Sequence, residues 1–95
     1  MSTALDSDRV FEIVRAAIAR VLEIDPATIG RGTGLTTDLH ADSLALVEMV
    51  ELVEGEVRGL HGGFAIDDDD VEDLDTVGQA VDYVLARLSS IEADC

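Results

Sequence analysis

The sequence predicts an all-α fold, a small four-helix bundle of three longer helices and one short helix, with a long loop between the first two helices. In several segments apolar residues recur every three or four positions, which is the spacing of one helix face. No segment alternates between apolar and polar residues for long enough to form a strand. With 95 residues the chain can build one hydrophobic core, so we expect a single domain over residues 1–95.

The first helix is predicted over Asp8–Ile24. Asp6 or Ser7 can cap its start. Asp25-Pro26 should end it, because the residue before a proline avoids the helical conformation. The buried stripe of this helix is expected to comprise Val10, Ile13, Val14, Ala17, Ile18, Val21 and Leu22.

A long loop is predicted over Ala27–His40. It contains three glycines and four threonines, a composition that disfavours a continuous helix. Three apolar residues are spaced along the loop and should pin it to the core: Ile29, Leu35 and Leu39.

The second helix is predicted to begin at Asp42-Ser43 and to run to about Val57. Glycine weakens a helix interior, so we expect the helix to end between Gly55 and Gly59. One stripe of this helix is apolar and comprises Leu46, Val50, Val53 and Val57. The opposite face carries Leu44, Val47, Glu48, Glu51 and Glu54.

Two more helices are predicted in the last third of the chain. A short one is expected over Asp67–Leu74, because acidic residues favour a helix N-terminus and Val71 and Leu74 can face inward. Thr76 and Gln79 have the spacing of a capping box, which predicts the start of the last helix. Its buried side should comprise Val77, Ala80, Val81, Val84, Leu85 and Leu88.

The composition restricts the partners. The chain has 21 acidic residues against six arginines and no lysine, a formal charge of -15. This charge repels nucleic-acid phosphates and anionic membranes, so we expect neither as a partner and expect proteins with basic docking surfaces instead. The start of the chain does not resemble a signal peptide and no apolar stretch is long enough to span a membrane, so we expect a cytoplasmic protein. We also expect it to be a monomer. Cys95 is the only cysteine, which excludes an internal disulfide, and we expect no metal site.

The most informative segment is Asp38–Leu44. It places Asp42 and Ser43 at the start of the second helix, where unpaired amides and the positive helix end favour an anion. A phosphodiester on Ser43 would be stabilised there. Capping of the helix by Asp42 or Ser43 explains the same two residues without any ligand, but it leaves the acidic face of the helix unexplained.

These residues resemble the acyl carrier proteins of fatty acid and polyketide synthesis. The resemblance covers nearly the whole chain and rests on Asp38-Leu39, Ala41-Asp42-Ser43-Leu44, Val47-Glu48, Leu22–Ile29, Leu35, Thr76-Val77, Ala80 and Tyr83. It implies that a separate phosphopantetheinyl transferase attaches 4'-phosphopantetheine from coenzyme A to Ser43. The thiol of this arm would carry acyl groups as thioesters, so the protein would be a carrier and not an enzyme.

The resemblance also assigns roles to the neighbours of Ser43. Asp42 would meet the metal or basic groups of the transferase, with Leu44 beside it. Synthase enzymes of the ketosynthase, acyltransferase or acyl-ligase type would dock on a face made of Asp38, Leu44, Val47, Glu48, Glu51 and Glu54. The core is mostly aliphatic, with 3% aromatic residues in the chain, and we expect an acyl-chain pocket lined by Leu35, Leu46, Val50, Val53, Leu74, Ala80 and Val84.

The chain departs from the family pattern at three places. His40 stands where the family usually has glycine, which predicts a different turn before Asp42. Glu51 stands where an apolar residue is common, which bears on partner preference. The segment Arg58–Phe64 is longer than the family's usual spacing by about five residues.

Four other interpretations are open. A peptidyl or aminoacyl carrier shares the fold and the arm, although Ala41–Leu44 favours the acyl branch. The run Asp67–Asp70 could indicate a calcium-binding site, but it lacks the ligand spacing of an EF-hand. A hydrolase would need His40 or His61 as the base for Ser43, and no oxyanion hole is evident. An acidic helical adaptor without a prosthetic group is the last alternative.

Overall fold

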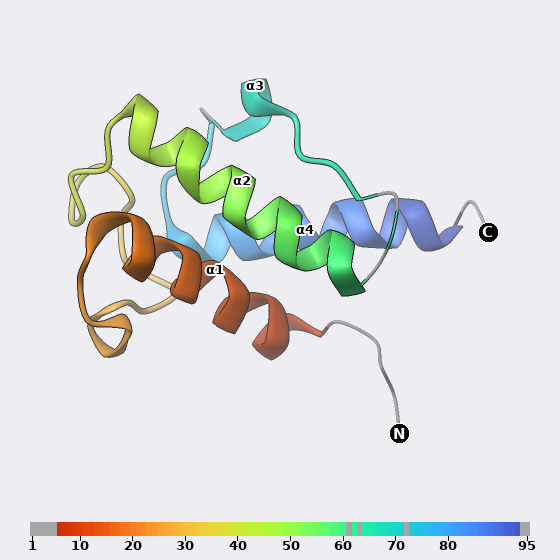
Figure 1. Cartoon of the computed structure of the whole chain (residues 1–95), viewed down its shortest axis with the longest axis horizontal. Helices are drawn as coiled ribbons and strands as arrows, with labels where there is room; N and C mark the ends of the chain where they lie inside the picture. The colour runs from red at the N-terminus through yellow and green to blue at the C-terminus, as the bar shows by residue number, and fades with distance from the viewer. Residues whose placement is uncertain (1–5, 61, 63, 72, 94–95) are drawn as a thin grey trace.

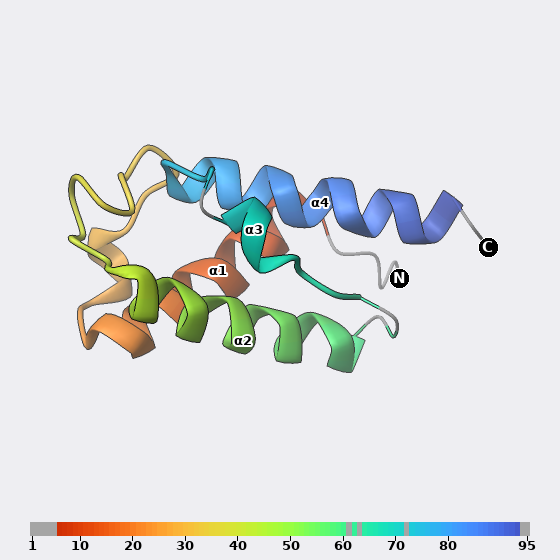
Figure 2. The same cartoon turned by 90° about the horizontal axis from the view of Figure 1, so that it is seen from above.

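The computed structural model describes residues 6–60, 62, 64–71 and 73–93. It contains the long helices α1 (Ser7–Leu22), α2 (Ser43–Leu60) and α4 (Val77–Ala93), the short helix α3 (Asp68–Val71) and the 3-10 turn η1 (Pro26–Thr28). α1 packs against both α2 and α4, whereas α3 packs against α2 (Figure 1). Seen from above, α3 lies between α2 and α4 (Figure 2). The predicted all-α bundle with a long loop between its first two helices is confirmed, and no strand occurs within the described ranges.

The start of α1 follows the prediction, whereas its end does not. The Asp6 side chain accepts a hydrogen bond from the Arg9 amide at 2.8 Å and caps the helix. The predicted end at Ile24 is wrong by two residues. Glu23 adopts the left-handed conformation, with φ of 56°, and returns its amide to the Ala19 carbonyl. The helix therefore closes before it reaches Asp25, whose side chain caps η1 instead.

The predicted end of α2 between Gly55 and Gly59 is also wrong, because the helix continues to Leu60. A Cβ atom at either glycine would meet no atom within 4 Å, so both glycines lie on an open face. Each costs about 1 kcal/mol relative to alanine. The opposite face buries Val57 completely, and tertiary packing of this kind offsets a weak local propensity.

The loop between α1 and α2 is tied to the start of α4. The Leu35 amide donates to the Asp75 carbonyl at 2.8 Å, and the Gly78 amide donates to the Arg31 carbonyl at 2.7 Å. A Cβ atom at Gly78 would lie 3.0 Å from that carbonyl oxygen, which explains the glycine. Two of the predicted anchors, Ile29 and Leu35, are each 3% exposed, so the prediction of a pinned loop is confirmed.

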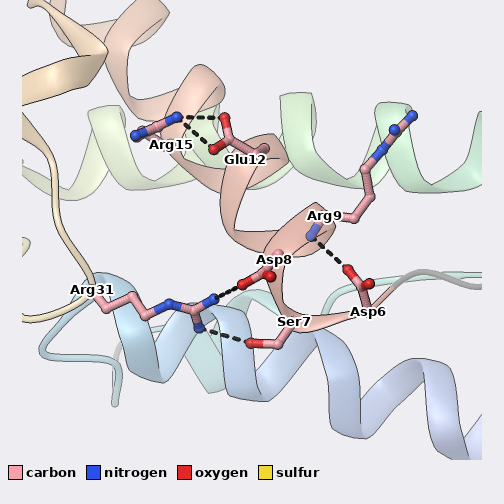
Figure 3. A network of polar contacts seen from close by, with 7 residues as sticks. All are labelled: Asp6, Ser7, Asp8, Arg9, Glu12, Arg15 and Arg31. Atoms are coloured by element: carbon pink, nitrogen blue, oxygen red, sulfur yellow. Dashed lines mark hydrogen bonds and ion pairs between the residues drawn. The ribbon is translucent and has the colours of Figure 1, made fainter.

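The polar residues near the start of α1 form a second attachment for this loop (Figure 3). Arg31 donates hydrogen bonds to Ser7 and Asp8. The guanidinium groups of Arg15 and Arg31 lie 5.2 Å and 4.9 Å from the centre of the Phe11 ring. Arg15 contacts Phe11 and Glu12 within α1, whereas Arg31 comes from the loop, so the polar and cation-π contacts of Arg31 hold the loop against α1.

The C-terminal elements begin close to where the sequence predicts. α3 has four residues and is shorter than the predicted Asp67–Leu74. The Thr76 hydroxyl accepts a hydrogen bond from the Gln79 amide at 3.2 Å, and the Gln79 side chain accepts one from the Asp75 amide at 2.6 Å. These two bonds confirm the predicted cap of α4. Four residues of its predicted buried side are 4% exposed or less: Val77, Val81, Val84 and Leu88.

Candidate functional site

Ser43 is the first residue of α2, and its neighbour Asp42 caps the helix. The Asp42 side chain accepts a hydrogen bond from the Ala45 amide at 2.8 Å, and its carbonyl accepts one from the Leu46 amide at 3.0 Å. Ser43 is exposed, and its hydroxyl has no hydrogen bond to the described part of the chain. Of the two possible caps, the structure uses Asp42. The serine hydroxyl is left available for chemistry.

The surroundings of Ser43 fit a covalently attached phosphate. The amides of the first helical turn have no partner within the helix, and the helix dipole places a partial positive charge at this end. A phosphodiester on the exposed serine oxygen would lie in that field. Ser43 and the flanking Asp42 and Leu44 are all exposed, so the position is accessible in the described structure.

The turn before Ser43 is held by the backbone of a buried alanine. The Ala41 amide donates to the Leu35 carbonyl at 2.9 Å, and Ala41 is buried. The preceding His40 has φ of 55°, a conformation that glycine adopts without strain and that costs other residues about 1 to 2 kcal/mol. His40 thus makes the left-handed turn for which glycine is best suited. It is exposed and forms no hydrogen bond with Ser43, and His61 and Cys95 lie outside the described residues.

Asp38, assigned to docking from the sequence, has a task within the loop. Its carboxylate accepts a hydrogen bond from the Gly34 amide at 2.7 Å. Gly34 is buried, and a Cβ atom there would collide with the Thr37 hydroxyl. Asp38 itself is exposed, so the carboxylate is accessible while it holds this turn.

The other residues assigned to docking divide into two groups. Leu44 and Val47 are 67% and 39% exposed, and Glu48 and Glu51 are exposed and form no ion pair with the described residues. These four residues, at spacings of three and four, make one strip along α2 next to Ser43, which we call the front strip. Glu54 does not extend it freely, because its carboxylate accepts a hydrogen bond from the Ile66 amide at 2.9 Å and pairs with Arg58 at 3.2 Å.

All seven residues predicted to form the acyl-chain pocket line one apolar cavity of about 50 Å³. They are Leu35, Leu46, Val50, Val53, Leu74, Ala80 and Val84. The prediction left out other residues that line it: Val14, Ile18, Met49, Ile66, Val71 and Tyr83. Met49 could have been found, because it lies three residues after Leu46 and four before Val53 on the same helical stripe.

Tyr83 connects α4 to the start of α3 at the wall of this cavity. Its hydroxyl donates to the Asp70 carboxylate at 3.0 Å and accepts from the Asp67 amide at 3.1 Å. Burial raises the pKa of Tyr83 above its usual 10.0, and the hydrogen bond to Asp70 acts in the same direction. The hydroxyl is therefore neutral at physiological pH and able to donate.

Within the described ranges, no helix has the length and apolar character needed to cross a membrane. In the same part of the chain, no three or more histidine, cysteine, aspartate or glutamate residues are grouped so that they could hold a metal ion. The predicted absence of calcium at Asp67–Asp70 is not tested, because the side chains of Asp68 and Asp69 lie outside the described part of the chain.

Comparison with known proteins agrees with this geometry. The family described as "Phosphopantetheine attachment site" matches residues 12–84, a range that includes Ser43. An acyl carrier protein of Lactobacillus acidophilus is 35% identical over 80 residues, which cover 84% of this chain and 94% of that protein. One from Thermotoga maritima is 35% identical over 81 residues, or 85% of this chain and 94% of the relative. One from Petrotoga mobilis is 31% identical over 90 residues, or 95% of this chain and all of the relative.

Proposed function

Because this chain belongs to the acyl carrier protein family, we propose that it carries acyl groups as thioesters on a 4'-phosphopantetheine arm attached to Ser43. The choice of Ser43 as the attachment residue rests on one observation. Asp42 satisfies the start of α2, so the exposed Ser43 hydroxyl is not needed by the fold. When bound, the arm supplies a thiol that no residue of this site provides.

In the proposed reaction Ser43 is the substrate of a separate transferase. The serine oxygen forms the new bond to phosphorus as the bond to the nucleotide part of coenzyme A breaks, and the serine proton passes to the transferase. The chain itself contributes an accessible hydroxyl and the positive end of α2, which stabilises the phosphodiester product. It then acts as a carrier and has no catalytic step of its own.

The front strip is proposed to be the docking surface for the transferase and for synthase enzymes. Its two glutamates are not engaged by arginines of the described chain, so their charge is available to basic partners. Charge of this kind increases the rate of encounter without requiring tight binding. A carrier that visits several enzymes in turn needs both properties.

The apolar cavity is proposed to take up the start of an acyl chain. Its volume of about 50 Å³ is small. An engineered apolar cavity of roughly 150 Å³ holds benzene, so an acyl chain of several carbons requires the helices to part. Each methylene removed from water contributes about 0.8 kcal/mol towards that opening. An eight-carbon acyl group should raise the melting temperature and shift the backbone resonances of Leu46, Val53 and Leu74, whereas an acetyl group should do neither.

The proposed function is tested by intact mass. The protein is incubated with coenzyme A, magnesium and a broad-specificity phosphopantetheinyl transferase, and we expect the mass of one arm to be added. Ser43→Ala should abolish the addition without changing the helical content, because Ser43 is exposed and makes no bond that the fold uses. A wild-type chain that stays unmodified with several transferases, or an alanine variant that is modified, would contradict the proposal.

A further inference from the structure

A groove runs between α1 and α2 on the side of the front strip. It has a volume of about 410 Å³ and is lined by Arg20, Val21, Glu23, Glu48, Glu51 and Leu52. In both views of the bundle the C-terminal end of α1 lies beside the first half of α2 (Figures 1 and 2). An adjoining groove of about 390 Å³ shares Arg20 and Leu52 and adds Glu12 and Glu56 to the lining. Arg20 is thus the one cation among five carboxylates in the two linings.

Arg20 is the basic residue in the last turn of α1, where its charge complements the helix dipole, but it has no specific polar partner within the described part of the chain. The arginines at positions 15, 31 and 58 form ion pairs, and Arg87 donates to the Ala65 carbonyl at 3.3 Å. Arg20 is exposed and forms neither a hydrogen bond nor an ion pair with any described residue. A guanidinium group offers five N–H donors in a planar fork that matches a carboxylate in two-point contact. No described residue accepts a hydrogen bond from the Arg20 guanidinium, so its donors are available to a partner.

The position of the groove indicates which partner covers it. Glu48 follows Ser43 by five residues, so the groove begins about 7 to 8 Å along α2 from the reacting hydroxyl. An enzyme that approaches Ser43 over the front strip also meets the groove, because Glu48 and Glu51 belong to both. If Ser43 is the attachment residue, that enzyme is first the phosphopantetheinyl transferase.

We propose that the transferase docks across both α1 and α2 and places a carboxylate on Arg20, flanked by basic side chains that meet Glu23, Glu48 and Glu51. Leu52, which is half-buried and lines both grooves, supplies an apolar contact beside these charges. The inference rests on the proposed function. It adds to the front strip a contact of opposite sign on a different helix. A charge pattern of both signs fixes the orientation of a partner, whereas a uniformly acidic face only attracts it.

The alternative is that Arg20 only relieves repulsion among the surrounding glutamates. The two accounts predict opposite effects of Arg20→Glu on the rate of arm transfer. If the transferase recognises only the negative charge of this face, Arg20→Glu makes the face more acidic and should increase the rate of arm transfer. If a carboxylate of the transferase binds Arg20, the same change slows it, because two carboxylates then face each other.

The experiment measures kcat and KM for arm transfer by the transferase of the same organism, at low and at high salt. We expect Arg20→Glu to lower kcat/KM by about fivefold or more, mainly through KM, and Arg20→Gln to lower it by about twofold to threefold. Arg9→Glu is the matched control, because Arg9 lies at the other end of α1, is exposed and makes no side-chain bond with the described residues (Figure 3). It changes the net charge equally and should leave the rate unchanged or raise it slightly.

A rate for Arg20→Glu that equals or exceeds the wild-type rate overturns the proposal, as does an equal loss with Arg9→Glu. If Arg20→Glu loses its helical signal, Arg20→Gln decides the question, because it introduces no repulsion. Wild-type protein that accepts no arm from this transferase contradicts the proposed function itself, and this outcome is separate from a failure of the Arg20 proposal.

Discussion

The two halves of α2 contain similar residues but use them differently. In the first half, Leu44 and Glu48 are exposed, and no side chain of the front strip holds another part of the described chain. In the second half, Glu54 binds the Ile66 amide and Arg58 donates to the Phe64 carbonyl at 2.8 Å. The role of a glutamate on α2 therefore depends on which groups of the chain lie within reach of its carboxylate. Substitutions in the first half should therefore alter encounters with partners, and substitutions in the second half should alter stability.

The largest effect is expected at Phe64, which follows α2 in the chain and is tied to its second half by the hydrogen bond from Arg58. Phe64 is 0% exposed, and Phe64→Ala should lower the free energy of unfolding by about 3 to 5 kcal/mol through lost burial and a residual cavity. Leu44→Ala is the matched truncation in the first half, and because Leu44 is 67% exposed the loss should stay below about 0.5 kcal/mol. Urea denaturation measures both. Similar losses at the two positions would remove the distinction between the halves.

The two glutamates provide the next comparison. Glu54→Ala leaves the Ile66 amide without its acceptor and removes the ion pair with Arg58, which keeps its hydrogen bond to the Phe64 carbonyl, and it should lower the free energy of unfolding by about 1 to 2 kcal/mol. Glu48→Ala, on the same helix but without such contacts in the described residues, should change it by less than about 0.5 kcal/mol. Thermal and urea unfolding of the two variants give the answer. Equal stability of both variants would mean that the Glu54 contacts contribute nothing.

A charge reversal in the first half should alter a rate and leave the fold intact. Glu48→Lys combined with Glu51→Lys should slow arm transfer several-fold at low salt, because basic partners lose their attraction, and the difference should shrink at high salt. Far-ultraviolet circular dichroism should be almost unchanged, since both side chains are exposed. Transfer rates that match the wild type at low salt would show that the front strip is not the docking surface.

The smallest effect is expected at the turn before α2. His40→Gly should raise the free energy of unfolding by about 0.5 to 1 kcal/mol, because glycine takes φ of 55° without strain but loses more entropy on folding. His40→Ala keeps the strain and serves as the control. A glycine variant that is less stable than the alanine variant would mean that the strain relieved at this position is smaller than the entropy that glycine loses on folding.

Features that depend on local spacing could be predicted from the sequence. The caps at Asp6 and Thr76 and the stripes of the three long helices follow from patterns within a few residues of chain. The seven cavity residues were also found together, because residues on the inward stripes of packed helices converge on one core.

Features that depend on distant contacts could not be predicted. Two glycines close together, Gly55 and Gly59, are typical of a helix end. Only the burial of Val57 and Phe64 explains why α2 continues past them. In the sequence Glu54 is indistinguishable from Glu48 and Glu51. Only the fold brings the Ile66 amide, twelve residues later, within hydrogen-bond distance of its carboxylate. At the site itself, the sequence could not decide whether Asp42 or Ser43 caps α2, because both side chains can do so.

The most direct measurement of the central claim uses the protein from its own cells. The peptide that contains Asp42-Ser43-Leu44 is isolated under conditions that preserve thioesters and fragmented in a mass spectrometer. The account predicts a phosphopantetheine group on Ser43, with an acyl group on its thiol in part of the population. A peptide that carries no modification on Ser43 in growing cells, or an arm attached to another residue, would contradict it.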